Sequence, residues 1–391
     1  MVRAAAVCLL VSATAAARAD YPPVTDRNYA IELYDGVPLG NSATVAMGGA
    51  AAANALGTSG TLINPSASAV RPTTDTDPWS LDYHLDYLSS FASSDYDNNG
   101  IEIPGGSGPS LVTFGGGGRA RDWGLAITAT LASTPLDPGG ALRAQTLHTK
   151  VAFAHWVPQL DMAFGIAAQY AEFDLQKSCQ GFGCGTTMFS IQGAGLEAGW
   201  TWIPRLQSFR IGAAASSHVI GGKVVADQCQ DKTNCEGYIL PDTVTSPGRF
   251  VAGVAYRTSE TAWNQLVGGT FRDEPALTLA ADLAITGSSD HAYGLEAFGL
   301  HQLQPTGRHY AFSPRLGAEW ECLPGRLRLR AGSYYEPERY DGVPGRWHGT
   351  FGLQVRAFEF HAWGRRRGSI TLTGDLAARF QNVGISIGFW H

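Results

Sequence analysis

The sequence has no apolar run long enough to cross a membrane as a helix. Its longest run, from Ala4 to Ala16, follows Arg3 and covers about 13 residues, whereas a membrane helix needs about 20. It ends on Ala17-Arg18-Ala19, which has the form of a signal-peptidase site. We therefore predict that residues 1–19 are a cleaved signal peptide. A membrane-embedded mature chain must then be a closed β-barrel. Lipid offers no hydrogen-bond partner, so every backbone polar group must be paired within the protein.

Charged residues are also scarce, at 16% of the chain against about 25% in a typical soluble domain. In their place the chain carries 48 Gly, 17 Phe, 14 Tyr and 10 Trp. The formal net charge is −6, which argues against a nucleic-acid partner. This composition favours a barrel in contact with lipid.

Cysteine is rare, but four of the six cysteines form two short-range pairs in polar loops, Cys179 with Cys184 and Cys229 with Cys235. In an oxidising compartment this spacing indicates loop disulfides. A four-cysteine metal site is the alternative, but the spacing is unusual for zinc and no histidine supports it. Cys8 lies in the predicted signal peptide, so Cys322 is left over, and we expect it to be a free thiol at the end of a strand.

From Trp79 onward the sequence alternates between apolar and polar or small residues, which is the signature of transmembrane strands. The clearest case is 326–331, where three arginines alternate with Leu327, Leu329 and Ala331. The pattern predicts fourteen antiparallel strands, near residues 79–92, 109–118, 122–133, 144–157, 160–173, 188–203, 208–222, 249–258, 276–287, 311–322, 326–336, 346–357, 358–373 and 380–390. Residues 79–391 are therefore expected to form a transmembrane β-barrel.

Loop lengths give the orientation, because such barrels have short periplasmic turns and long external loops. An outward first strand places 93–108, 174–187, 223–248, 288–310 and 337–345 outside, with 292–302 as part of an external loop. Segment 259–275 is the exception, since it is long for a periplasmic turn. Gly115–Gly118 is interpreted as a turn between the second and third strands. The alternating last strand, with Phe389 and Trp390 near its end, is typical of substrates of the barrel-assembly machinery.

Residues 20–78 differ from the barrel, being rich in Ala and Gly and poor in charge. They contain Met47-Gly48-Gly49-Ala50 and then Asn64-Pro65-Ser66-Ala67. At this point the chain resembles the FadL/TodX family of outer-membrane channels for hydrophobic compounds. Short echoes follow in the family's order, such as Leu316-Gly317-Ala318-Glu319-Trp320 and Thr350-Phe351-Gly352-Leu353.

The resemblance implies an all-β, fourteen-stranded barrel whose lumen is occluded by an N-terminal hatch, here residues 20–78. It also implies that a ligand captured outside leaves through a kink in a barrel strand, at the place where the N-P-A stretch protrudes. Asn64, Pro65 and Ser66 match that stretch, with Ser66 in place of its Ala. The dipeptide Asn64-Pro65 also suits a plain turn before the first strand.

Asp95, Asp97 and Asn99 resemble the first half of a calcium loop, with oxygen ligands at positions 1, 3 and 5 and Gly100 at position 6. Gly106 stands where the loop should supply a bidentate Glu, so either a weak Ca²⁺ site or a solvated turn is expected. No other cofactor is indicated.

A lipase-type enzyme is disfavoured. Residues 288–291 read Ser-Ser-Asp-His, but side chains adjacent in sequence cannot converge as a nucleophile and its base do, and no G-x-S-x-G occurs.

Charges are expected in the lumen on two neighbouring strands. They are Arg326, Arg328 and Arg330 on one strand, and Arg315, Glu319 and Glu321 on the other. They could set ion selectivity in an open porin. With opposite signs on adjacent strands, they could equally form a cross-strand ladder inside a plugged barrel, which we favour.

We therefore predict a multi-pass barrel embedded in the lipid of the outer membrane of a Gram-negative cell. Its predicted function is the passive uptake of a small fatty-acid-like or aromatic molecule. A docking barrel of a secretion or motility complex is the main alternative. A general porin is the other, and a plugged lumen argues against it.

Overall fold

The computed structural model describes residues 21–34, 36–37, 40–73, 77–90, 95–102, 109–136, 142–177, 186–224, 231, 233–235, 237–267, 271–361 and 365–390. The predicted signal peptide lies outside this part of the chain. Within it, no helix has the length and apolarity of a membrane span.

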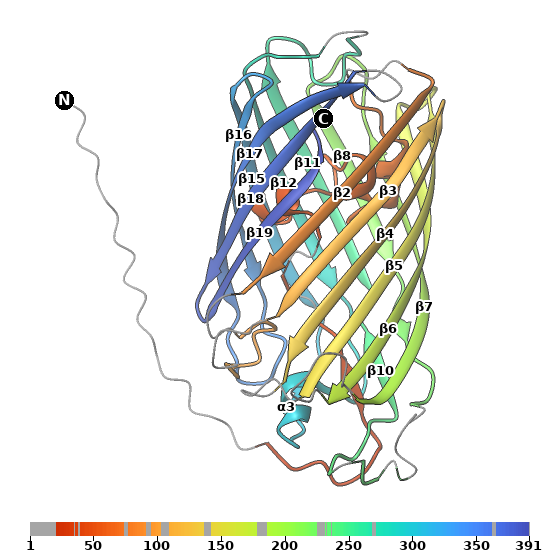
Figure 1. Cartoon of the computed structure of the whole chain (residues 1–391), viewed down its shortest axis with the longest axis vertical. Helices are drawn as coiled ribbons and strands as arrows, with labels where there is room; N and C mark the ends of the chain where they lie inside the picture. The colour runs from red at the N-terminus through yellow and green to blue at the C-terminus, as the bar shows by residue number, and fades with distance from the viewer. Residues whose placement is uncertain are drawn as a thin grey trace, which may run out of the picture.

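Fourteen strands close into an antiparallel barrel, as the alternation predicted (Figure 1). Around the barrel every strand pairs with its neighbour in the chain, and β19 pairs with β2 to close the ring. The strands are β2 (Trp79–Ser89), β3 (Ser110–Ala120), β4 (Trp123–Pro135), β5 (Leu142–Val157), β6 (Met162–Lys177), β7 (Thr186–Trp202), β8 (Phe209–Ser216), β11 (Arg249–Ser259), β12 (Ala276–Thr286), β15 (Ala311–Leu323), β16 (Leu327–Glu336), β17 (Arg346–His361), β18 (Arg365–Ala377) and β19 (Phe380–Phe389).

Short turns gather at one end of the barrel, where the C-terminus also lies, and long loops gather at the other (Figure 1). We call these the periplasmic and external ends. The predicted division into short turns and long loops is confirmed, and 292–302 lies outside the barrel strands, where it contains β13 (Ala292–Gly294) and α3 (Leu295–Gly299).

Three details of the strand prediction are wrong. The strand predicted at 208–222 ends at Ser216, and Val219–Ile220 form a short strand of a separate sheet. Gly115–Gly118 is not a turn but the middle of β3, and Arg121 and Asp122 make the turn instead. A side chain at Gly115 would overlap the ring of His84, and one at Gly117 would approach Thr58 and β4, so close packing explains the glycines. In addition, β17 continues to His361, whereas 358–361 was assigned to the following strand.

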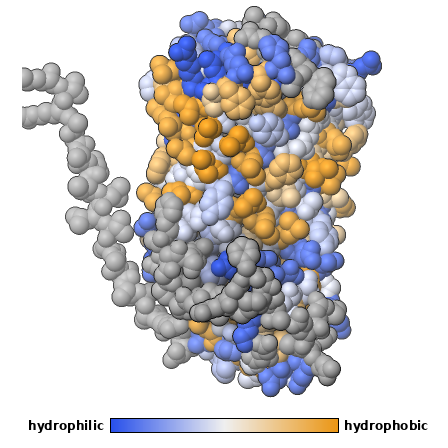
Figure 2. Space-filling model, in the orientation of Figure 1, coloured by the Kyte–Doolittle hydropathy of each residue, from blue (hydrophilic) through white to orange (hydrophobic). Residues whose placement is uncertain are grey.

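Large apolar side chains face outward along the barrel. In β17, Trp347, Phe351, Leu353 and Val355 are exposed, and the alternate residues 348, 350, 352 and 354 are buried. Figure 2 shows an apolar zone over the middle of the barrel and hydrophilic residues toward its ends. A closed barrel with an apolar outer band is the architecture of outer-membrane proteins. The protein is therefore a barrel of the outer membrane.

The external end is covered by a small sheet of five short strands, in the order β14-β13-β1-β10-β9. Its middle strand, β1 (Ala30–Glu32), comes from the N-terminal segment and pairs in parallel with β10 (Thr243–Ser246) and β13. The two outermost strands are β9 (Val219–Ile220) and β14 (Pro305–Thr306). Residues 20–78 were predicted to plug the lumen, but 21–34 lie at its external mouth, since Tyr29 and Ile31 join an apolar cluster of the external loops and the external ends of β5, β6 and β7.

A buried ion pair holds β1 in this external cap. Arg339 donates to both carboxylate oxygens of Glu32, which also accepts from Ser289 Oγ (2.7 Å) and Thr306 Oγ1 (2.8 Å). Glu32 is 1% exposed and Arg339 5%. A buried carboxylate without its partner is strongly destabilising, so the cap depends on this pair.

Replacing Arg339 with Met should therefore reduce the free energy of cap opening by about 3–5 kcal/mol. Hydrogen exchange of the β1 amides measures that free energy. Arg308→Met is the matched control, because Arg308 and Asp341 form an exposed pair whose loss should cost under about 1 kcal/mol. Equal effects of the two substitutions would contradict the role given to Arg339.

Candidate functional site

Residues 40–73, which we call the hatch segment, lie inside the barrel (Figure 1). They form α1 (Ser42–Ala46), α2 (Gly57–Thr61) and the 3-10 helix η1 (Pro65–Ala69). The segment is mostly Ala, Gly, Ser and Thr, so its backbone approaches the wall closely. Two of its helices have a side-chain N-cap. Asn41 accepts from Ala43 N at the start of α1, and Asn64 accepts from Ser66 N at the start of η1.

Three aspartates of the barrel wall hold the backbone of the hatch segment. Asp86 accepts from Ser42 N (2.8 Å), Asp82 from Thr58 N (2.6 Å), and Asp282 from both Ala51 N and Ala52 N (2.8 Å each). Hydrogen bonds to a charged acceptor are stronger than neutral ones. The alternation placed these aspartates on one face of their strands, but nothing in the sequence linked them to the hatch.

Glycines of the wall receive the Met47-Gly48-Gly49 turn. A Cβ on Gly317 of β15 would lie 2.5 Å from Met47 O, and one on Gly332 of β16 would lie 2.3 Å from Gly48 N. Gly48 itself has a positive φ of 62° and lies against the backbone of Ser333. These contacts leave no room for a side chain, which explains why both the turn and the wall carry glycine here.

The Asn64-Pro65-Ser66 turn packs against the opposite wall. Asn64 Nδ2 donates to Ala52 O (3.0 Å) and Trp200 O (3.1 Å), and Ser66 Oγ lies 2.8 Å from Thr201 Oγ1. The hydroxyl that distinguishes Ser66 from Ala thus adds a bond to the wall. Gly165 of β6 and Gly199 of β7 leave space for the turn.

The wall beside this turn is continuous, which differs from the kink that the resemblance implied. Pairing of β6 with β7 runs unbroken from Met162↔Trp202 to Leu175↔Phe189, and the only register shift, between Leu175 and Gln176, is at the external end. Pairing of β4 with β5 is regular throughout. Every backbone ladder therefore stays closed where the hatch turn touches it.

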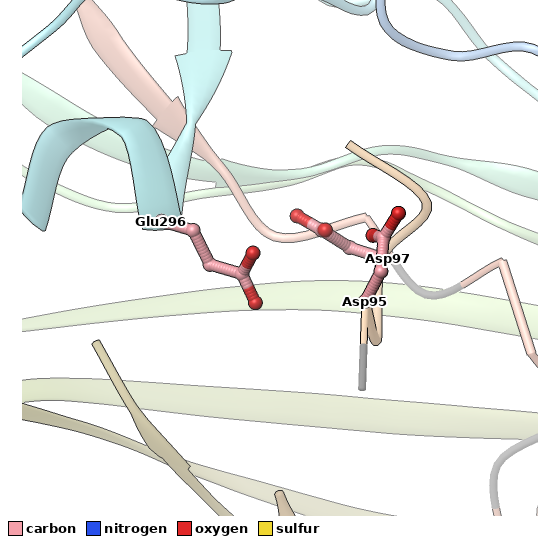
Figure 3. Close-up of side chains that lie close together, drawn as sticks. All are labelled: Asp95, Asp97 and Glu296. Carbon is pink, nitrogen blue, oxygen red and sulfur yellow. The ribbon is translucent and has the colours of Figure 1, made fainter. Parts of the chain in front are cut away.

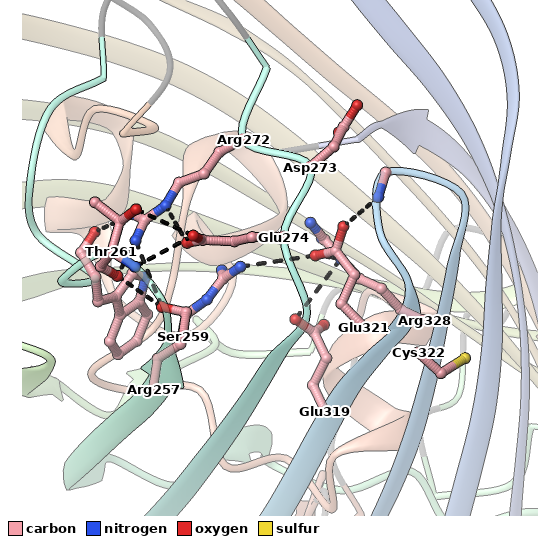
Figure 4. A network of polar contacts seen from close by, with 12 residues as sticks. Arg257, Ser259, Thr261, Arg272, Asp273, Glu274, Glu319, Glu321, Cys322 and Arg328 are labelled. Carbon is pink, nitrogen blue, oxygen red and sulfur yellow. Dashed lines mark hydrogen bonds and ion pairs between the residues drawn. The ribbon is translucent and has the colours of Figure 1, made fainter.

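The predicted lumen charges separate into three groups. Arg330 Nε donates to Glu319 (2.7 Å) and Arg328 Nε to Glu321 (3.0 Å), so four of the six form cross-strand pairs. Figure 4 shows Arg328 with Glu319 and Glu321. Arg315 is buried nearer the external end of the lumen, opposite Asp282 in the register. Arg326 was placed wrongly: it is exposed in the turn before β16, because the strand starts one residue later than expected.

The exception among the loops was 259–275, and its described residues 260–267 and 271–275 lie at the periplasmic end of the lumen. Its Asn264 accepts from Arg210 Nε (2.8 Å), and the guanidinium of Arg210 lies 4.0 Å from the centre of the Trp263 ring. Arg272 pairs with Glu274 at 2.5 Å (Figure 4). A turn that folds back over the lumen needs this length.

Two cavities lie on either side of the hatch segment. The external one has a volume of about 170 Å³, and its apolar lining comprises Leu33, Leu62, Ile63, Val219, Pro247 and Val251. Polar groups face it as well, including Lys150, which pairs with Glu197 at 2.5 Å and donates to Thr61 O and Leu62 O of the hatch.

The periplasmic cavity, of about 160 Å³, is more charged, with Asp82, Arg257, Glu319, Arg328 and Arg330 in its lining. Its other side is formed by the hatch segment, from Asn41 to Gly60. The hatch segment thus separates an external cavity with a mixed apolar and polar lining from a more strongly charged periplasmic cavity.

A third hollow lies on the outer surface of the barrel, directly behind the Asn64 turn. It has a volume of about 480 Å³ and is floored by Gly165, Gly199 and alanines, with a rim of exposed aromatic and aliphatic side chains: Trp123, Phe153, Phe164, Ile166 and Phe250. Because the floor consists of glycine and alanine, little more than the strand backbone separates the hatch turn from this surface.

Two of the three predicted calcium ligands are brought together with a carboxylate that the sequence did not single out. Asp95 and Asp97 lie beside Glu296 of α3, with one oxygen of each residue within 4.8 Å of the others (Figure 3). Burial raises the pKa of Asp97 to about 7 and that of Asp95 to about 6, and raises the pKa of Glu296 well above its usual value. Asn99 points its Oδ1 at Ile101 N instead, and Gly106 lies outside the described residues.

The remaining candidates are placed as follows. Cys322 is a free thiol next to the last residue of β15. Cys235 is buried and disulfide-bonded, whereas Cys179, Cys184 and Cys229 lie outside the described residues, so both pairings stay predictions. Ser289 Oγ donates to Glu32 and so serves the cap.

No protein family and no curated protein matches the chain by sequence. Solved structures do match. The monoaromatic hydrocarbon channel CymD is 13% identical, with a TM-score of 0.53, and covers 90% of this chain and 96% of its own. The toluene transporter TodX of Pseudomonas putida is 13% identical, with a TM-score of 0.52, over 93% and 99%.

A FadL homologue of Pseudomonas aeruginosa is 11% identical, with a TM-score of 0.51, and covers 90% of this chain and 98% of its own. In each case the match spans almost the whole neighbour. The chain therefore has the fold of these outer-membrane channels, in agreement with the resemblance seen in its motifs.

Substituting Gly332 with Leu should detach the Met47-Gly48-Gly49 turn, because the new side chain overlaps the backbone of the hatch. We expect the hatch segment to become sensitive to protease added from the periplasmic end, while heat-modifiable gel migration shows that the barrel still folds. Gly349→Leu is the control, since Gly349 faces outward with no atom within 4 Å of its Cβ position. Equal protection of the hatch in both variants would contradict this role of Gly332.

Proposed function

We propose that the protein is an outer-membrane channel for passive uptake of small hydrophobic molecules. One observation carries the proposal: a small-residue hatch separates a partly apolar external cavity from the periplasmic cavity, within a barrel of the hydrophobic-channel fold. A plugged lumen does not suit a general porin, which needs an open aqueous path. No energy source is required, since the ligand moves down its own gradient.

The external cavity supports a compact ligand. Its volume of about 170 Å³ is below the roughly 300–1,000 Å³ of pockets for drug-sized molecules. A single aromatic ring fits that size better than a long acyl chain. CymD and TodX are described as a monoaromatic hydrocarbon channel and a toluene transporter, so we propose that the substrate class here is also small aromatic compounds.

The route past the hatch is proposed to lead sideways, through the wall beside Asn64 and Pro65. Glycine and alanine make the wall thin there, and the hollow outside is apolar and opens to lipid. The periplasmic cavity is a poorer exit for an apolar molecule, because it is lined by arginine and glutamate. The described structure is then the closed state, and opening requires a local break in the ladder between β6 and β7.

A docking barrel is the second candidate, and the closed path favours it. A scaffold needs no route through the hatch, and the ion pairs of the periplasmic half are also what a sealed lumen would carry. The channel and the docking barrel can be distinguished by one simple measurement, the flux of a hydrophobic compound across the membrane.

We predict that cells lacking their own hydrophobic-compound channels take up radiolabelled toluene several-fold faster when they make this protein. Gly199→Leu should change the rate, because its side chain would displace Asn64 from the wall. The outward-facing Gly349→Leu should leave the rate unchanged.

Uptake equal to that of cells without the protein, for toluene and for a labelled fatty acid, would overturn the channel proposal if gel migration shows a folded barrel. The docking barrel would then be favoured. Unchanged uptake by Gly199→Leu, beside clear uptake by the parent, would keep the channel and reject the sideways route.

A further inference from the structure

We infer that Asp95, Asp97 and Glu296 form a binding site for a divalent cation, of the Ca²⁺ type, that ties the external loops together. The sequence offered only half of a calcium loop, since Gly106 occupies the position of the bidentate Glu. The fold supplies the missing carboxylate from α3, about two hundred residues along the chain. This inference is independent of what the channel transports.

The spacing of the carboxylates suits a calcium ion. Their nearest oxygens lie within 4.8 Å of one another. Oxygens coordinate Ca²⁺ at about 2.3–2.6 Å, so two ligands on opposite sides of the ion are about 4.6–5.2 Å apart. A set made only of oxygen donors favours Ca²⁺ or Mg²⁺ over zinc, which prefers nitrogen and sulfur.

An independent observation points to a ligand in this space. Glu296 is 3% exposed, and its Oε2 has no hydrogen-bond partner; Asp97 Oδ1 is also buried without one. Figure 3 shows the Glu296 carboxylate directed toward the two aspartates. Buried carboxylate oxygens almost always have a partner, and a cation between them would serve both.

Neither of these two oxygens forms an ion pair with a basic side chain among the described residues. Arg379 Nη2 lies 3.4 Å from Asp95 Oδ2, which also accepts from Gly100 N. Arg346 is near, but its guanidinium is held by Glu336 at 2.5 Å. Tyr340 donates its hydroxyl to Asp97 Oδ2 (2.6 Å) and leaves Oδ1 free. Asp97 and Glu296 have no ion pair with any cationic residue in the described structure.

A cation here would join three separate external segments. Asp95 and Asp97 belong to the loop after β2, Glu296 to the loop between β12 and β15, and Tyr340, bonded to Asp97, to the loop after β16. The site therefore acts as a clasp on the external cap, and Ca²⁺ outside the cell would stabilise the closed loops.

The test uses the full-length protein, refolded in detergent, with Ca²⁺ alone as the ligand at constant ionic strength. Isothermal titration calorimetry should show one saturable site with a Kd of about 0.1–1 mM, the range of extracellular calcium modules. Glu296→Gln should weaken binding at least about tenfold, because it removes one of three ligand charges. Glu338→Gln is the control, since Glu338 is exposed in a neighbouring loop.

A second measurement separates a metal site from a merely structural carboxylate. In EDTA, Glu296→Gln should raise the unfolding temperature of the cap above that of the parent, because it removes repulsion among buried carboxylates. In 5 mM Ca²⁺ the order should reverse. Asp97→Asn should behave in the same way and replaces Glu296→Gln if that variant does not fold.

Absence of saturable Ca²⁺ binding by the folded parent would overturn the site. The same conclusion would follow if both carboxamide variants bound Ca²⁺ as tightly as the parent, or if Ca²⁺ shifted the unfolding temperature of all variants equally.

Discussion

The inside of this barrel is too wide to be filled by its own side chains, and the rest of the structure follows from how that space is closed. Eight strands enclose roughly the volume of their inward side chains, whereas fourteen leave a lumen. Here the N-terminal segment fills it with backbone, and buried backbone groups need partners. Strand carboxylates supply them: Asp82, Asp86 and Asp282 each accept from the hatch segment.

Close packing of backbone against backbone also explains the composition. Glycines that would weaken a β-strand through lost packing recur where the hatch touches the wall, at Gly165 and Gly199 on one side and Gly317 and Gly332 on the other. Because these positions lack large side chains, the wall of the barrel is also thin there. If a ligand leaves sideways, it passes through the wall at the same place where the hatch segment packs against Gly165 and Gly199.

The two ends of the lumen are closed by different kinds of interaction. At the external end, an apolar cluster and the buried Glu32–Arg339 pair hold the loops around β1. At the periplasmic end, Trp263 and a network of arginine and glutamate fill the mouth. A hydrophobic ligand is compatible with the first environment more than with the second, which agrees with entry from outside and exit before the periplasmic mouth.

Much of this could be predicted from the sequence. Alternation of lipid-facing and inward residues is a local property of each strand, so strand number and most bounds followed from it. The motifs at Met47 and Asn64 led to the prediction of a hatch. Contacts between distant segments could not be predicted: which backbone groups Asp282 binds, that Glu296 completes the group of Asp95 and Asp97, that β1 crosses to the external cap, or that Gly115–Gly118 is strand. A one-residue error in the start of β16 was enough to misplace Arg326, because a residue in the turn lies outside the strand and no longer follows its alternation. Periodicity determines which face a residue occupies, whereas only the closed barrel decides what it meets there.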